Sequence, residues 1–347
     1  MKKRQILVIG NNDNGCTPEL EKLAYDVGSE IAKSDSVLIT GGLGGVMRAA
    51  CRGAQESGGT TVGIIPQDDP SHANEFCDIV IPSGMGLTRD FLNALSADGV
   101  IVIGGGFAGM NAAITAKLNG SEVVLITKQH PLRSHSSSSH SGVNVALNDG
   151  DSVEQHIQDT VESGDGLCDS DLVEKLCKEA QEEVVRLDRW GVPFSRNESG
   201  LLDFVRFGGS SIARTAFAGD AAGHFILQVL YEQIMRLEIP VLQDCLVLSL
   251  VISDDKCRGV CYYDIPTGKT VIEQGNAVIL ATGGANQMFG TTSSAFSATG
   301  DGMAAAYRQG VPLMDMEFVQ FHPTSLPSTG LVITEMARSL GGRIVDK

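Results

Sequence analysis

Three glycines in the middle of the chain have the spacing of a turn that binds the diphosphate of a dinucleotide. Gly104, Gly106 and Gly109 follow an apolar run and open a helix predicted over residues 108–118. In that context Gly104 allows the turn, Gly106 lets the backbone approach the pyrophosphate, and Gly109 lets the helix pack closely on the sheet. With a returning strand predicted at 122–127, the spacing indicates a dinucleotide site.

The end of the returning strand argues against NAD as the dinucleotide. Folds that bind NAD place Asp or Glu there, where the carboxylate bonds to ribose hydroxyls. This chain has Thr127 and Lys128 at that point. The missing carboxylate weakens the case for NAD as the ligand of the glycine turn.

A second glycine-rich turn, Gly41 to Gly45, precedes a helix predicted over residues 46–55. Clustered glycines allow close approach of a ligand, and the free N–H groups of a helix start favour phosphate. A plain tight turn fits the same residues, so this turn alone is weak evidence of a site.

Short apolar segments alternate with amphipathic ones along the part of the chain that carries both turns. This alternation is typical of βαβ units, so the predicted fold class is α/β with parallel sheets. Strands are predicted at 5–9, 37–40, 61–65, 78–81, 100–103 and 122–127, and helices at 18–33, 46–55 and 108–118.

Composition excludes several classes of protein. The 347 residues suggest about two domains, and 42% hydrophobic with 20% charged residues allows a large core. The net charge of −16 argues against a surface for nucleic acid or anionic lipid. No apolar run approaches the length of a membrane span. The eight cysteines form no CxxC pair, which favours reduced thiols in a cytoplasmic protein over disulfides or a metal site.

Residues 41–86, GGLGGVMRAACRGAQESGGTTVGIIPQDDPSHANEFCDIVIPSGMG, resemble the Rossmann-like family of lysine decarboxylase-like phosphoribohydrolases. The likeness is greatest to its branch of molybdenum-cofactor carriers. That family has a second turn with a Gly-Thr pair and a catalytic Glu, and residues 104–110 contain neither. Arg89 matches a ligand-contacting arginine of the family, and without the Glu the resemblance implies no catalytic role for it.

Residues 132–144 resemble the histidyl-flavin loop of the succinate dehydrogenase/fumarate reductase flavoprotein family. That family also tends to lack the acidic residue after its second strand. The likeness continues to the end of the chain in ordered motifs: RWGVPFSR at 189–196, FGG at 207–209, ARTAFAGDAAGH at 213–224, AVILATGGANQMF at 277–289, the run at 299–324 and VITEMARSLGG at 332–342.

This second resemblance implies FAD as the cofactor and a covalent bond to it from His135, which would raise the flavin potential. Asp301 matches a carboxylate on the ribose or adenosine side of FAD, and it also suits a helix cap. His140 and Ser141 depart from the Gln-Gly that is usual in the family. The implied cofactor-binding residues are Gly104, Gly105, Gly106, Phe107, Ala108, Gly109, Thr127, Lys128, Arg133, Ser134, His135, Ser136, Ser141, Gly142 and Asp301.

The same resemblance implies a site for a C4 dicarboxylate, succinate or fumarate. His322 and Thr334 would donate hydrogen bonds to a carboxylate, and Glu335 would join a proton relay. The family's proton-delivering arginine lies further along, in the capping domain, and the chain reaches Lys347 before any counterpart. By family, the partners are an iron–sulfur subunit and a membrane anchor. The expected location is the cytoplasm, at the cytoplasmic face of the inner membrane by family.

The two resemblances divide the chain and meet at one strand. Residues 1–98 are predicted to form a Rossmann-like half domain related to nucleotide or cofactor carriers. Residues 99–347 are predicted to form a FAD-binding domain that ends at the start of its cap. Both families have a strand followed by glycines at 99–106, and we expect this strand to join the flavin sheet, because its helix and return strand follow directly.

Three functions follow from this division. The leading one is a flavoprotein oxidoreductase of succinate/fumarate type, incomplete as given. The second is a nucleotide or molybdenum-cofactor binding carrier module in residues 1–98. The third is a non-functional chimera, because each half lacks the complement that its family has. The sequence leaves open whether the junction is a natural fusion or an artefact.

Overall fold

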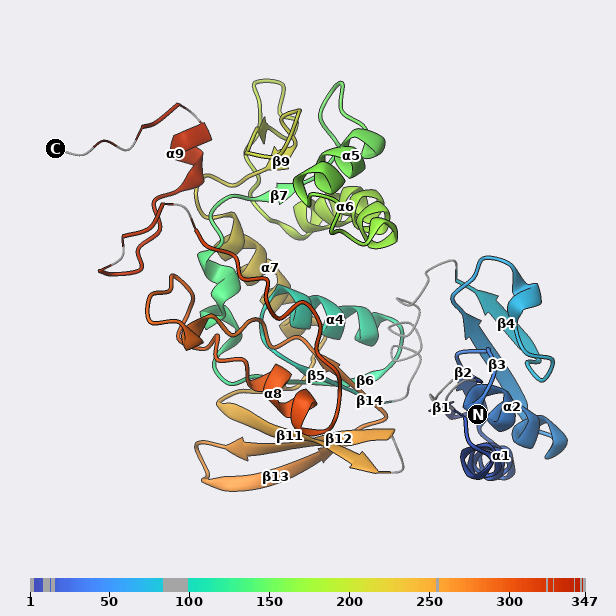
Figure 1. The fold of residues 1–347 in the computed structure, drawn as a ribbon. Coiled ribbons are helices and arrows are strands. Elements are labelled where there is room, and N and C mark those ends of the chain that lie inside the picture. Colours follow the sequence, from blue (N-terminus) through green and yellow to red (C-terminus); the bar gives the residue numbers. More distant parts are fainter. Residues whose placement is uncertain are drawn as a thin grey trace.

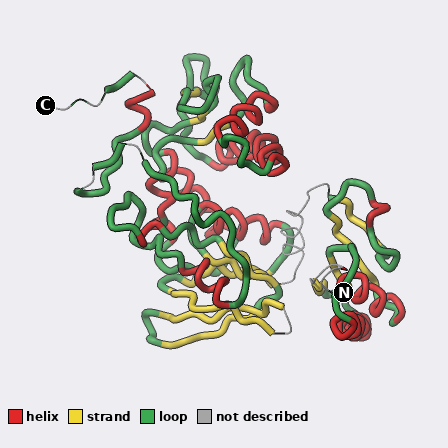
Figure 2. The backbone as a smooth tube through the Cα atoms, viewed as in Figure 1, coloured by secondary structure: helices red, strands yellow, loops and turns green. Residues whose placement is uncertain are grey.

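The computed structural model describes residues 3–8, 13, 16–83, 99–253, 256–322, 324–326, 328–339, 341–343 and 345. Within these residues the chain forms two separate parallel sheets, which Figures 1 and 2 show with their helices. No helix among them is both long enough and apolar enough to cross a membrane. Arg89 lies outside the described residues.

The first sheet contains four parallel strands in the order β1-β2-β3-β4. Two helices, α1 and α2, pack on it through a core of small and branched side chains that includes Val8, Leu38 and Ala50. The helices cross closely at Gly28 of α1, which has no side chain to separate them. A Cβ there would lie 2.0 Å from the carbonyl oxygen of Ala50. The bounds are β1 Gln5–Val8, α1 Pro18–Lys33, β2 Val37–Thr40, α2 Val46–Glu56, β3 Thr60–Ile65, the short 3-10 helix η2 Pro70–His72 and β4 Ile79–Pro82.

The second sheet is also parallel, in the order β10-β6-β5-β14. Strand β5 pairs with β6 on one side and with β14 on the other, so the strand at the junction lies in this sheet, as we expected. Helix α4 follows β5 and returns the chain to β6. The bounds are β5 Gly99–Ile103, α4 Phe107–Leu118, β6 Glu122–Ile126, β10 Val241–Leu242 and β14 Ala277–Leu280.

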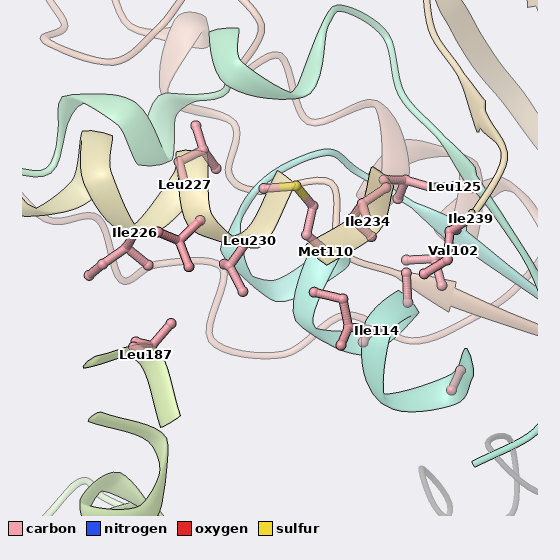
Figure 3. Close-up of a cluster of buried hydrophobic side chains, with 14 of the residues drawn as sticks. Val102, Met110, Ile114, Leu125, Leu187, Ile226, Leu227, Leu230, Ile234 and Ile239 are labelled. Atoms are coloured by element: carbon pink, nitrogen blue, oxygen red, sulfur yellow. The ribbon is translucent and has the colours of Figure 1, made fainter. Parts of the chain in front are cut away.

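Alternating side chains of β5 face two different layers, as the pleat of a strand requires. Val100 and Val102 pack against α4 and against α7, Ala222–Arg236, in the core drawn in Figure 3. Ile101 and Ile103 face the opposite way, toward an antiparallel sheet. Strand β5 is therefore buried on both faces, which explains its unbroken apolar sequence.

The antiparallel sheet contains β11, β12 and β13 in sequence order and was not predicted from the sequence. Two register shifts interrupt the pairing of β11 with β12. These irregularities weaken the strict alternation that marks a half-buried strand. Its strands are β11 Cys245–Ser253, β12 Lys256–Asp264 and β13 Lys269–Gln274.

A third region, from residue 143 to residue 216, carries a small antiparallel sheet and two helices beside it (Figure 1). Helix α6 ends at Gly191, which has φ +112° and forms a left-handed cap. The strands here are only two residues long. The bounds are β7 Val143–Asn144, α5 Val153–Ser163, α6 Ser170–Trp190, β8 Phe204–Val205 and β9 Thr215–Ala216.

Arg214 is completely buried in this third region and is held by two carboxylates. Its guanidinium lies 3.1 Å from Asp151 and 2.9 Å from Asp159. Desolvation opposes ionisation of Asp159, but hydrogen bonds from Ser211 and Gln155 and the charge of Arg214 outweigh it and lower the pKa of that carboxyl. Burial, with Arg214 second, lowers the pKa of neighbouring His156. Arg214 is thus the one cation that these two buried acidic side chains share among the described residues.

The last described elements return to the second sheet and then cross its surface. Helix α8, Asp301–Arg308, packs on β11, and α9, Glu335–Ser339, is a single short turn. Three 3-10 turns complete the structure: η4 Pro131–Arg133, η5 His135–Ser138 and η6 Asn286–Met288. All eight cysteines are free in the structure.

Candidate functional site

A cavity of about 940 Å³ opens at the carboxyl ends of β5, β6 and β14. Loops leave parallel strands at this edge, which is where ligands bind in α/β sheets. The glycine turn after β5, the serine-rich loop at 134–141 and the turn at 281–284 all line the cavity. Residues from the far end of the chain, up to Glu335, line it as well.

The glycine turn has the geometry that its spacing predicts. Gly104 has φ +119°, and a Cβ there would lie 2.0 Å from the carbonyl oxygen of Ala281. A Cβ on Gly109 would lie 1.8 Å from the carbonyl oxygen of Gly104, so this glycine brings α4 against the turn. A Cβ on Gly106 would lie 3.1 Å from Ser136 Oγ, at the cavity wall. Gly106 thus lines the cavity at a point where a side chain would press on the serine-rich loop.

The serine-rich loop closes over the start of α4. Ser136 Oγ accepts a hydrogen bond of 3.2 Å from the Phe107 N–H. The Ser139 carbonyl accepts a bond of 2.9 Å from the N–H of Gly223, at the start of α7. Ser134 Oγ is buried and has no hydrogen-bond partner among the described residues. The loop thus presents a hydroxyl group that still needs a polar partner.

Lys128 and Asp301 form an ion pair in the wall of the cavity. Thr299 completes the group, because its hydroxyl lies 2.5 Å from Lys128 Nζ and 2.8 Å from Asp301 Oδ2. The carboxylate absent from the end of β6 is thus supplied by the start of α8. Thr127 lines the cavity beside Lys128.

His135 lies in the cavity wall with an exposed side chain. Its Nδ1 accepts a hydrogen bond of 3.2 Å from the Ala295 N–H, so the neutral ring carries its proton on Nε2. Partial desolvation lowers the pKa of His135, which favours the neutral ring. Nε2 is the ring nitrogen that remains for contact with a ligand.

The three residues predicted for a dicarboxylate also line the cavity. His322 Nδ1 accepts a bond of 3.2 Å from the Thr324 N–H, which leaves Nε2–H as a donor. Thr334 donates its hydroxyl hydrogen to Asp220 Oδ1 at 2.7 Å. Glu335 is paired with Arg338 at 2.5 Å on the same turn of α9.

Three of the predicted cofactor residues lie outside the cavity wall. Gly109 serves the packing of α4, as described above. Arg133 is exposed, and its carbonyl accepts a bond of 2.6 Å from the Gln129 side chain. A Cβ on Gly142 would lie 2.2 Å from the carbonyl oxygen of Ala216, so Gly142 lets the loop pass β9. The remaining predicted residues line the cavity: Gly104, Gly105, Gly106, Phe107, Ala108, Thr127, Lys128, Ser134, His135, Ser136, Ser141 and Asp301.

The sequence did not single out Asp220 or Thr299 as site residues. Asp220 binds both Thr334 and His140, and Thr299 bridges the ion pair of Lys128. Each lies inside a motif that the sequence did mark, at 213–224 and 299–324. Their polar side chains next to a helix start were the available signal.

In the first sheet, a carboxylate oxygen accepts a hydrogen bond from the main chain where the glycine turn meets α2. The Gly45 N–H donates a bond of 2.8 Å to Asp13 Oδ1, immediately before α2. Arg48 lies 3.8 Å from the same carboxylate. A carboxylate therefore occupies the position where a helix start favours an anion.

The cavity at the second sheet has the features that FAD requires. Its volume is within the range of cofactor pockets, and its lining mixes glycines and apolar side chains with many polar groups. Gly106 lines the cavity without a side chain, and Ser134 Oγ is a buried hydroxyl without a partner among the described residues. The residues present therefore fit the cofactor.

Comparison with curated proteins finds flavoprotein subunits. The chain is 41% identical over 251 residues to a fumarate reductase flavoprotein subunit of Mycobacterium tuberculosis, which covers 72% of this chain and 43% of the relative. It is 38% identical over 257 residues to a succinate dehydrogenase flavoprotein subunit of Rickettsia felis, covering 71% of this chain and 43% of the relative. The chain thus spans less than half the length of these relatives.

Comparison with solved structures gives the same result. An Escherichia coli quinol fumarate reductase variant matches with a TM-score of 0.67 and 36% identity, over 70% of this chain and 42% of that chain. A Mycobacterium smegmatis Sdh1 complex matches with a TM-score of 0.66 and 33% identity, over 69% of this chain and 43% of that one.

Two family matches overlap at the junction. Residues 3–155 match the SLOG cluster4 family, so this likeness continues through β5 into the second sheet. Residues 99–347 match the FAD binding domain family. The second match spans most of the chain and contains the whole cavity described above. The chain therefore belongs to the FAD binding domain family.

Proposed function

We propose that the chain is a FAD-dependent oxidoreductase of the succinate dehydrogenase/fumarate reductase type. One observation carries this proposal: a single cavity joins the glycine turn and His135 to His322, Thr334 and Glu335. Cofactor-binding and substrate-binding residues are thus brought to one space from segments that lie far apart in the sequence. The similarity to flavoprotein subunits at about 40% identity supports the same function.

The chain's own residues would hold FAD along the cavity. The turn at Gly104–Gly109 and the start of α4 suit the diphosphate, because both present backbone N–H groups there. Asp301 suits the ribose or adenosine side. The serine-rich loop, with Ser134, Ser136 and Ser141, suits the flavin side. Bound there, FAD would supply the hydride-accepting and hydride-donating chemistry.

The substrate class is a C4 dicarboxylate, succinate or fumarate. His322 offers Nε2–H as a donor to a carboxylate. Thr334 also lines the cavity, but its hydroxyl hydrogen is donated to Asp220 and would have to leave Asp220 to bond to a substrate. Donors fixed before reaction stabilise charge that develops on a carboxylate. The Glu335–Arg338 pair on α9 supplies a carboxylate for proton transfer.

We infer that His135 is the attachment point of a covalent flavin. Its Nε2 is the nitrogen left for bonding, since Nδ1 is held by Ala295, and desolvation favours the neutral ring. The matched relatives are named flavoprotein subunits. On that basis we propose an iron–sulfur subunit and a membrane anchor as partners, at the cytoplasmic face of the inner membrane.

The experiment that tests this function starts with the purified chain. Acid precipitation separates covalent from free flavin, and extraction identifies it. We expect FAD, and we expect fumarate or succinate to perturb the flavin absorbance. A chain that yields only FMN or NAD contradicts the proposal. A chain that retains FAD but shows no response to either dicarboxylate supports FAD binding and contradicts the substrate class.

A second function is proposed for the first sheet. The match to the SLOG cluster4 family and the anion-favouring turn at Gly41–Gly45 support binding of a nucleotide or molybdenum cofactor. Asp13 would have to leave Gly45 for a phosphate to bind. Retention of AMP or molybdopterin by the purified chain, lost on a Gly44→Val substitution, is the expected result. A chain that retains neither contradicts this function.

A further inference from the structure

Two cysteines beside the first sheet have their sulfur atoms in contact. Cys51 lies on α2 and is completely buried, and Cys77 lies between η2 and β4 and is half-buried. Their Sγ atoms are 3.9 Å apart, although the residues are 26 positions apart in the sequence. A disulfide bond is about 2.05 Å long, so a short approach of the two sulfurs would join them.

Hydrogen bonds determine which of the two thiols ionises first. The contact with Cys77, with further bonds from Thr40 and Asn74, lowers the pKa of the Cys51 thiol in spite of its burial. The same contact, together with burial, raises the pKa of Cys77. The thiolate is the form that attacks another sulfur, so Cys51 is the nucleophile of the pair.

Cys51 is linked to the glycine turn Gly41–Gly45 through one hydroxyl group. Its Sγ lies 3.3 Å from Thr40 Oγ1, and the same oxygen accepts a hydrogen bond of 3.0 Å from the Gly42 N–H. A cysteine in a disulfide has no hydrogen to donate, so oxidation leaves Thr40 as the only possible donor in its contact with the sulfur. The orientation of this hydroxyl is therefore coupled to the oxidation state of Cys51.

Cys77 is linked to the same turn through Asn74. The Cys77 N–H donates a bond of 3.2 Å to the Asn74 carbonyl. Asn74 in turn donates its main-chain N–H to the Gly42 carbonyl at 2.7 Å and its side-chain amide to the Leu43 carbonyl at 2.9 Å. A Cβ on Gly63 of β3 would lie 2.6 Å from Cys77 Sγ and 2.9 Å from Gly42 Cα, so the thiol and the turn pack closely on this strand. A movement of Cys77 toward Cys51 would therefore disturb the turn.

We propose that Cys51 and Cys77 are a redox modification site, whose reversible disulfide weakens ligand binding at the glycine turn of the first sheet. Hydrogen peroxide is the oxidant. It transfers one oxygen atom to one thiol, which gives a sulfenic acid and a water molecule, and the second sulfur then displaces that oxygen as a second water. The two sulfurs together lose two hydrogens and two electrons. The effect on a ligand rests on the second function proposed above, the binding of a nucleotide or molybdenum cofactor.

The first test is the disulfide itself, which requires no ligand. The purified chain is treated with hydrogen peroxide, its remaining thiols are blocked with N-ethylmaleimide, and it is digested with trypsin. Cleavage after arginine places Cys51 on peptide 49–52 and Cys77 on peptide 53–89. We expect mass spectrometry to find these two peptides joined, and dithiothreitol to separate them.

Cys77→Ser should abolish this link, and Cys261→Ser, which changes a half-buried thiol on β12, should keep it. Peptides 49–52 and 53–89 that both carry N-ethylmaleimide after peroxide treatment of the unsubstituted chain would overturn the proposal. This outcome does not depend on whether either variant folds.

The second test measures the glycine turn. The amide signals of Gly42 and Asn74 in ¹⁵N spectra should shift on oxidation and return with dithiothreitol. With AMP as the probe, oxidation should raise the dissociation constant by about twofold to tenfold, the effect of disturbing one hydrogen bond. Cys77→Ser should remove this response to peroxide, and Cys261→Ser should retain it.

The outcomes separate the inference from the function on which it rests. Unchanged Gly42 and Asn74 signals, or an unchanged AMP affinity, in a chain that contains the disulfide contradict the inference alone. A reduced chain that binds no AMP contradicts nucleotide binding and the proposed effect on it, whereas linked peptides still support the modification site.

Discussion

Asp301 and Lys128 form an ion pair that joins the start of α8 to the end of β6. The second strand of a dinucleotide fold for NAD ends in a carboxylate that belongs to the strand itself. Here the strand ends in a cation, and the carboxylate comes from a helix 173 residues later. The negative charge of Asp301 is therefore held near the cavity but partly neutralised.

Asp301→Asn should weaken FAD binding by about tenfold to a hundredfold, since a hydrogen bond to a charged group contributes about 1.5–3 kcal/mol. Flavin fluorescence quenching during titration of the apoprotein measures the dissociation constant. Glu317→Gln removes an exposed carboxylate outside the cavity and is the matched control. Equal affinities for the two variants would remove Asp301 from the cofactor site.

Gly106→Val should abolish FAD binding. A Cβ at this position would lie 3.1 Å from Ser136 Oγ, and the two methyl groups of valine would extend further into the space for the diphosphate. The bound flavin per chain, measured from absorbance after gel filtration, should fall to background. Gly208→Val is the control, because nothing lies within 4 Å of a Cβ built there. Stoichiometric flavin in the Gly106 variant contradicts the assigned turn.

His135→Ser should leave flavin bound only non-covalently, with a lower midpoint potential, because the covalent bond withdraws electrons from the ring. Acid precipitation followed by gel fluorescence detects the covalent adduct, and redox titration gives the potential. His72→Ser, on η2 after the first sheet's strand β3, should retain the adduct. Covalent flavin that survives in His135→Ser would assign the bond to another residue.

The region around α5 and α6 should lose stability below pH 6.5. The folded state lowers the pKa of His156 from its ordinary value of 6.5, so the unfolded chain binds more protons below that value. Asp159 acts in the same direction at lower pH, because its pKa is lowered from 3.8. Trp190, the one tryptophan of the chain, lies on α6 and reports urea unfolding by fluorescence.

His156→Gln should flatten this dependence between pH 7.5 and pH 5.5, and His72→Gln should not. A midpoint in urea that is the same at both pH values in the unsubstituted chain would show that His156 titrates normally in the folded protein.

Arg214→Met should destabilise the same region by about 3–5 kcal/mol, because it leaves Asp151 and Asp159 buried without their cation. Urea unfolding followed at Trp190 measures the change. Arg196→Met is the control, since Arg196 and Asp188 form a partly exposed pair that contributes less than about 1 kcal/mol. Similar losses in the two variants would contradict the buried-charge argument.

The sequence predicts elements that depend on neighbouring residues. The strand at 99–103, the helix at 107–118 and the strand at 122–126 lie within one residue of their expected bounds, because strand, turn and helix are adjacent in the chain. The antiparallel sheet β11–β13 was not predicted, since bulges interrupt the pairing of β11 with β12.

The candidate site divides in the same way. The residue types at the glycine turn and at His135 could be found from motifs. The pairing of Lys128 with Asp301 and of Thr334 with Asp220 could not, because each joins residues more than one hundred positions apart. The contact of His140 with Asp220 likewise joins two segments that only the folded chain brings together.

The position of β5 has a consequence for how the chain folds while it is being synthesised. Strands β1 to β4 are synthesised first, and β1 ends as an edge of their sheet. β5 gains β6 soon after it emerges, but its second neighbour, β14, is not made until residue 280. During that interval one edge of β5 has no partner strand. The match to the SLOG cluster4 family covers β5 as well as the first sheet. Nascent chains between residues 130 and 276 are therefore the form in which we expect mispairing and chaperone capture to concentrate.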